Sequence, residues 1–203
     1  MHEPIRPSPV QGCDMSTIKA FLEAGKSLIT LGAGANAAAR QQIRDVTGQL
    51  ADELDRALSL ADSYLVGVRF SKDDHELAAY LYDARSKLMG SYHEHHICAG
   101  LYQLADKFGQ MFDPTRFSVS LGSYSEIPQL IEHLKNGERA VIDDLDELIG
   151  QFHELAARLD AAPAEQKEQA RAAILASADY FRDKLAQQRK QVKNSRRRIV
   201  DTL

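Results

Sequence analysis

The chain has 203 residues, of which 44% are hydrophobic and 27% charged, and its formal net charge is −4 at pH 7. A chain of this length can bury one sizeable core, and we expect one domain or at most two. The negative balance excludes a protein whose whole surface is built for nucleic acid, although it is compatible with a local basic patch. Cys13 and Cys98 are too few for a disulfide framework, which favours a reducing compartment such as the cytoplasm.

Proline is confined to a few points of the chain. Because proline inside a helix costs about 3 kcal/mol, the long proline-free tracts between these points are free to form long helices. Apolar residues recur in the tracts at three- and four-residue spacing, and each apolar stripe must be covered by another helix. The sequence therefore predicts an all-α fold, a four- to five-helix bundle with long antiparallel, partly coiled-coil helices. The prolines are Pro4, Pro7, Pro9, Pro114, Pro128 and Pro163.

The first part of the chain predicts a tail followed by two helices. Residues 1–15 contain three prolines and no apolar run, so we expect a disordered tail without a secretory signal, and a single helical bundle domain over residues 16–203. Ser16 or Thr17 can cap a first helix that ends near Gly32. A second helix follows Asn36 and continues to about Val68, which at 1.5 Å per residue is roughly 50 Å of helix.

Three further helices are expected. The third spans residues 74–112, and its glycines can bend it. Residues 116–124 alternate between apolar and polar side chains, which predicts a strand or an extended loop. The fourth helix begins after Ser125 and the fifth follows Pro163, so that residues 126–200 form an antiparallel hairpin. The seam of the fourth helix is Leu145, Leu148, Phe152, Leu155 and Leu159.

Two glycine motifs have a formal resemblance to nucleotide-binding loops, but their context argues against that role. Residues 20–27 match a P-loop with alanine in place of the first glycine, and residues 31–37 fit the dinucleotide-binding pattern G-x-G-x-x-A. Both loops require a preceding strand, and the alternating strands and helices of such folds are missing. The alternative interpretation of residues 31–37 is a glycine-alanine hinge or a close helix crossing. We therefore expect no bound cofactor.

A histidine cluster at residues 93–98 is the one candidate for a metal. If this segment is helical, His95 and Cys98 share a face and offer two soft ligands, while other histidines would have to complete the site. The spacing supplies only half a site and matches no metalloprotease or di-iron pattern. A polar histidine layer in the core is the competing interpretation, and we assign no metal.

Charge is distributed unevenly over the last two helices. The fourth helix carries eight acidic residues from Glu132 to Asp160 against three Lys or Arg, and the fifth carries eight cations between Arg182 and Arg198. A hairpin that turns near Ala162 would leave this basic end overhanging the acidic cluster. Cations near a helix C-terminus also complement its dipole, so a binding role is one of two interpretations. The candidate partner- or anion-binding residues are Arg182, Arg189, Lys193, Arg196 and Arg197.

These patterns lead to one main functional hypothesis and two alternatives. The main hypothesis is a non-enzymatic helical protein–protein interaction module, an adaptor, scaffold or regulatory partner, that uses exposed helix faces and the basic last helix, with self-association as one form of partnership. The first alternative is a bundle that binds anionic membranes through the Gly/Ala-rich segment 18–39 or the basic helix. The second is a metal-binding bundle or small enzyme using residues 93–98. Nucleic acid is not expected, because no aromatic residues interleave with the basic positions.

Overall fold

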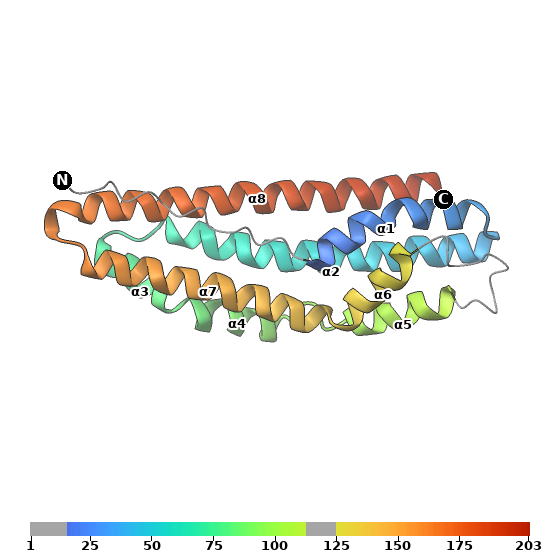
Figure 1. Cartoon of the computed structure of the whole chain (residues 1–203), viewed down its shortest axis with the longest axis horizontal. Coiled ribbons are helices and arrows are strands. Elements are labelled where there is room, and N and C mark those ends of the chain that lie inside the picture. Colours follow the sequence, from blue (N-terminus) through green and yellow to red (C-terminus); the bar gives the residue numbers. More distant parts are fainter. Residues whose placement is uncertain (1–15, 113–124) are drawn as a thin grey trace.

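The computed structural model describes residues 16–112 and 125–203, and within these ranges it is all-helical, as the sequence predicts. Figure 1 shows the helices along one elongated molecule. The described ranges hold eight α-helices, one short 3-10 helix and no strand. The α-helices are α1 (Ser16–Ala33), α2 (Ala37–Val68), α3 (Asp74–Tyr82), α4 (Ala84–Glu94), α5 (Leu101–Met111), α6 (Glu126–Lys135), α7 (Gly137–Ala161) and α8 (Lys167–Thr202), and the 3-10 helix is η2 (Ala164–Gln166). The predicted tail 1–15 and the predicted strand or loop 116–124 lie outside the described residues.

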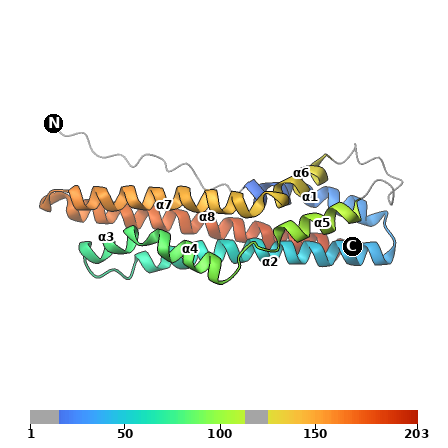
Figure 2. The ribbon, with the colours of Figure 1, turned by 90° about the horizontal axis from the view of Figure 1, so that it is seen from below.

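The two longest helices, α2 and α8, lie antiparallel and run along most of the molecule (Figure 1). Near the turn between α7 and α8, this pair is covered by α3, α4 and α7, which contact one another. Towards the other end it is covered by α1, α5 and α6. Figure 2 shows the same division from below. The last helix therefore has α2 and α1 as its main neighbours, and α7 contacts it over a smaller area.

Local capping explains why the second and third helices begin where the sequence predicts. The Asn36 side chain accepts a hydrogen bond from the Ala39 N–H at 2.9 Å, which satisfies one of the free donors of α2. Asp73 does the same for α3, accepting from the Glu76 N–H at 2.8 Å, while the Glu76 carboxylate accepts from the Lys72 N–H at 2.6 Å. These caps are purely local, so the sequence is sufficient to find them.

The predicted continuous helix over residues 74–112 is instead three helices. The chain leaves the α-helix after Glu94, and two residues of the following turn, His96 and Cys98, have φ values of 48° and 62°. The turn is held from α2, where the Glu53 carboxylate accepts from the Cys98 N–H at 3.1 Å and Arg56 donates to the His95 carbonyl at 2.9 Å. Contacts from a distant helix thus override a helical pattern. The predicted fourth helix is likewise divided into α6 and α7 at residue 136.

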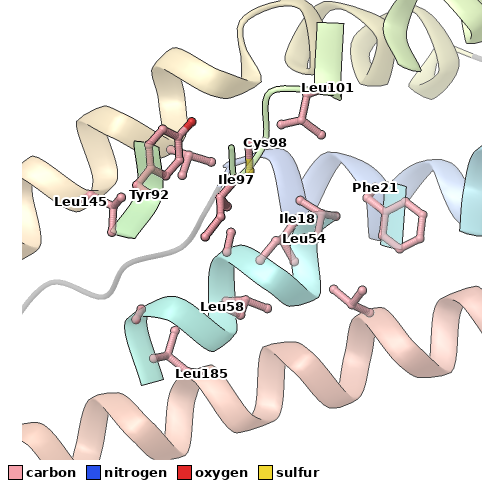
Figure 3. Close-up of a cluster of buried hydrophobic side chains, with 14 of the residues drawn as sticks. Ile18, Phe21, Leu54, Leu58, Tyr92, Ile97, Cys98, Leu101, Leu145 and Leu185 are labelled. Atoms are coloured by element: carbon pink, nitrogen blue, oxygen red, sulfur yellow. The ribbon is translucent and has the colours of Figure 1, made fainter. Parts of the chain in front are cut away.

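One continuous cluster of buried hydrophobic side chains runs through the molecule. Figure 3 shows part of it, where residues of α1, α2, α7 and α8 meet the 95–100 turn. Aromatic contacts lock α2 to α3: the rings of Tyr64 and Tyr80 stack with centroids 5.0 Å apart. Each of these tyrosine hydroxyls also donates to the other residue's carbonyl, at 3.2 and 3.0 Å. Burial and satisfied polar groups therefore coincide at this crossing.

Candidate interaction surface

The structure places the predicted basic stripe of α8 against α2 rather than against α7. Four of the five predicted cations form ion pairs with carboxylates of α2. Because the two helices are antiparallel, cations later in α8 pair with carboxylates earlier in α2. The basic end of α8 extends beyond α7, and there α1 and α2 pack against it (Figure 1). The pairs are Arg182 with Asp62 at 3.0 Å, Arg189 with Asp55 at 2.8 Å, Lys193 with Asp55 at 3.4 Å and Arg196 with Asp52 at 2.6 Å.

The Arg189–Asp55 pair has the best geometry of the four. The guanidinium donates to both carboxylate oxygens, Nε at 2.8 Å and Nη2 at 3.2 Å, and the two side chains are 30% and 25% exposed. The hydrogen bond from Arg189 lowers the pKa of Asp55, and the same bond raises the pKa of Arg189. Both groups are thus held in their charged forms, and the pair ties the middle of α8 to α2.

Three of the predicted residues line an open groove between the first half of α2 and the end of α8. We call it the α2–α8 groove, and its volume is about 750 Å³. The Arg196 guanidinium lies beside Gly48, 3.7 Å from where a Cβ would be, which is an ordinary van der Waals distance. The groove is lined by Gln41, Arg44, Asp45, Gly48, Gln49, Asp52, Lys193, Arg196, Arg197, Val200 and Asp201. The structure thus brings Lys193, Arg196 and Arg197 together and leaves Arg182 and Arg189 outside.

Two exposed cations of α8 differ from the paired stripe. Arg197 lies in the α2–α8 groove, and Lys190 is exposed on the same side of the helix. Within the described ranges, neither forms an ion pair, unlike Arg182, Arg189 and Arg196. The predicted basic stripe therefore has two parts. Arg182, Arg189, Lys193 and Arg196 form ion pairs with α2, whereas Arg197 and the neighbouring Lys190 form none within the described ranges.

The segment proposed for membrane contact is helical but its apolar face is covered. Residues 18–33 belong to α1, and Ile18, Phe21 and Leu28 are at most 2% exposed because they pack into the shared core. An interfacial helix needs that face free to enter the lipid. Across the described residues, the helices include none that is long and apolar enough to cross a membrane.

The glycine motifs are part of helices and a turn. Residues 20–27, the P-loop match, lie within α1, so they cannot form a phosphate-wrapping loop. Residues 31–37 contain the end of α1, a short turn and the start of α2, and no strand precedes them among the residues described. The hinge and close-crossing interpretation fits, because a Cβ at Gly32 would lie 2.8 Å from Leu203 Cδ1.

The histidine cluster does not form the predicted half-site for a metal. The helix ends at Glu94, so His95 and Cys98 do not share a helical face; His95 is exposed, whereas Cys98 is fully buried. Burial, reinforced by the nearby Glu53 and Glu138 carboxylates, raises the pKa of the Cys98 thiol to about 12. The described part of the chain contains no group of three or more His, Cys, Asp or Glu residues that could hold a metal ion.

A half-buried carboxyl group was missed by the sequence reasoning. Asp144 of α7 lines a cavity of about 30 Å³ between α2, α7 and α8, beside Lys184 and several apolar side chains. Burial, and then the negative charges of Glu147 and Asp143, raise the pKa of Asp144 to about 6. Its place directly before the seam residue Leu145 is the sequence signal that could have identified it.

No family model, curated protein or solved structure matches this chain. The function must therefore be inferred from the surfaces described above.

Proposed function

We propose that this protein is a non-enzymatic helical interaction module, an adaptor, scaffold or regulatory partner, that docks an acidic protein segment along the exposed basic end of α8. The observation that carries the proposal is the α2–α8 groove, in which Arg197 has no ion pair with a described residue and cations outnumber carboxylates. Long-range attraction of an acidic partner to such a surface favours encounter and orientation. The cytoplasm and a coiled-coil arrangement of the long helices belong to this proposal.

The ion pairs beneath the groove support the proposal by fixing its shape. Arg189 and Asp55 hold α8 on α2, and Arg196 is held over Gly48 by Asp52. A surface whose cations are already positioned loses less side-chain entropy when a partner binds. An acidic protein is favoured over a membrane because the apolar face of α1, which lipid binding would need, is packed in the core.

A charge-reversal experiment tests the docking surface without breaking the fold. The variant Lys190→Glu/Arg197→Glu changes exposed residues that have no ion pair among the described ones, so it should remain as stable as the parent protein. The control Lys135→Glu/Arg139→Glu makes the same change of charge on exposed residues at the α6–α7 junction. Binding of a fluorescein-labelled, glutamate-rich peptide is measured by fluorescence anisotropy at several salt concentrations.

We expect the parent and the control to bind the peptide, and the Lys190/Arg197 variant to bind at least about tenfold more weakly. Rising salt should weaken binding of the parent protein. Equal binding by both variants would overturn the assignment of the surface. Binding to phosphatidylserine vesicles without binding to the peptide would instead support the membrane alternative, and concentration-dependent light scattering would show self-association.

A further inference from the structure

A second groove lies on the opposite flank of the same end of α8, facing α1. We call it the α1–α8 groove, and its volume is about 320 Å³, at the lower end of the roughly 300–1,000 Å³ typical of small-molecule sites. On an ideal helix, Arg198 and Arg196 are separated by about 200°, so the two grooves occupy different faces. The α1–α8 groove is lined by Leu22, Gly25, Lys26, Ile29, Gln191, Asn194, Ser195, Arg198 and Ile199.

The charge of this groove is positive and uncompensated. Lys26 borders it from α1 and Arg198 from α8, and no carboxylate is among its lining residues. Neither cation forms an ion pair within the described ranges, whereas the α2–α8 groove contains Asp45, Asp52 and Asp201. Two cations facing one hollow without a carboxylate repel each other, and a bound anion relieves that repulsion.

Neutral hydrogen-bond donors also line the groove. Gln191 and Asn194 bring side-chain amides to the groove, and Ser195 brings a hydroxyl. Gly25 faces this serine closely, because a Cβ at that position would lie 2.9 Å from Ser195 Oγ. A guanidinium, an ammonium and neutral donors together match the several oxygens of a phosphate group.

Apolar side chains complete the groove. Leu22 and Ile29 of α1 are only partly buried, and Ile199 of α8 lies beside them. A ligand that fills the groove would therefore carry a compact apolar part next to its anionic group. We propose that the α1–α8 groove binds the phosphate monoester of a small molecule with an apolar body, free or as a lipid headgroup.

The proposal is independent of partner docking, because it rests on Lys26 and Arg198 rather than on the α2–α8 groove. Calorimetry measures the binding of phenyl phosphate, inorganic phosphate and phenol to the full chain. Sedimentation with phosphatidic acid vesicles tests the lipid source. The test variant is Lys26→Gln/Arg198→Gln, and the matched control is Lys135→Gln/Arg139→Gln, which removes two exposed cations at the α6–α7 junction, outside both grooves. Circular dichroism of both variants tests whether they remain helical.

We expect the parent protein and the control to bind phenyl phosphate more tightly than inorganic phosphate, and phenol not at all. The Lys26/Arg198 variant should bind phenyl phosphate at least about tenfold more weakly. Binding to phosphatidic acid vesicles but not to phenyl phosphate, lost in the same variant, would assign the headgroup source. The proposal is overturned if neither probe binds, if phenol binds as tightly as phenyl phosphate, or if the two variants bind equally.

Discussion

At the scale of single residues, the crossing of α2 and α3 depends on the absence of a side chain at Gly67. The Tyr80 ring lies directly over this glycine: a Cβ there would meet the Tyr80 hydroxyl and lie 2.6 Å from the ring carbon that carries it. The ring cannot move away easily, because it stacks on Tyr64 and its hydroxyl donates to the Tyr64 carbonyl. Close approach and hydrogen bonding are therefore linked at one position.

We predict that Gly67→Ala lowers the free energy of unfolding by about 1–3 kcal/mol, the usual cost of overpacking. Urea denaturation followed by circular dichroism measures it. Gly90→Ala is the matched control, because nothing lies within 4 Å of a Cβ at this exposed position in α4. Alanine is the better helix former by up to about 1 kcal/mol, so the control should be as stable as the parent or more stable. A Gly67→Ala protein as stable as this control would contradict the packing described here.

Single residues also explain why the 95–100 turn could not be predicted from the sequence. The apolar spacing through Tyr92 and Cys98 is helical, yet His96 and Cys98 adopt left-handed backbone angles that non-glycine residues rarely occupy. The cause is Glu53 and Arg56 on α2, whose hydrogen bonds to the turn join residues about forty positions apart. The local sequence does not indicate such contacts, so it could not show that His95 and Cys98 do not share a helical face.

At the scale of elements, α7 places a titratable group beside the core. Ionisation of Asp144 at neutral pH costs the folded protein free energy, because burial and the charges of Glu147 and Asp143 raise its pKa to about 6. The folded protein therefore binds this proton more tightly than the unfolded chain does. The stabilisation by protonation is complete below the unfolded pKa of about 4 and is lost as the pH rises through about 6.

We predict that Asp144→Asn becomes progressively more stable relative to the parent protein between pH 4 and pH 7. The relative gain should reach about 1 kcal/mol, since the half-exposed carboxyl is partly screened by solvent. Thermal unfolding at a series of pH values measures the difference. The control Asp106→Asn removes an exposed carboxyl from α5 and should show no comparable pH dependence. A stability difference for Asp144→Asn that is constant with pH would refute the assignment.

Helix boundaries could be predicted where neighbouring residues in the sequence determine them. The ends of α2 follow from Asn36 and from the turn before Asp73, both of which are sequence signals with a clear physical basis. The division of α6 from α7 falls at the dipeptide Asn136-Gly137, which commonly marks a helix end, although the apolar spacing continues through it. Helix type thus follows from periodicity, whereas helix continuity depends on contacts with other helices.

At the scale of the whole molecule, ion pairs accompany the apolar packing of α8 on α2. The sequence identified the basic stripe on α8 correctly as a stripe, because 3.6-residue periodicity is local. The sequence analysis expected the last helix to pack mainly on the preceding helix. In the structure α8 packs mainly on the antiparallel α2, where Asp55 and Asp62 pair with its cations. The sequence therefore predicts that these cations share a helix face, but it does not show which of them are already paired with α2.

We predict that Arg189→Glu lowers the free energy of unfolding by about 2 kcal/mol, because it leaves the partly buried Asp55 facing a like charge. The exchange variant Arg189→Asp/Asp55→Arg should recover part of this loss, since it restores opposite charges across the two helices. Arg197→Glu is the control, and its stability should lie within about 0.5 kcal/mol of the parent protein. Urea titrations report all three. If Arg189→Glu unfolds at the same urea concentration as Arg197→Glu, the pair does not hold α8 on α2.

The distance in sequence between α2 and its main partner has a consequence for biosynthesis. A ribosome completes α2 about a hundred residues before it begins α8, so the nascent chain carries a long, partly apolar and acidic helix without its final cover. The longest interface of the molecule can therefore close only after α8 has been synthesised, and translation that stalls inside α8 leaves α2 uncovered and accessible to chaperones and proteases.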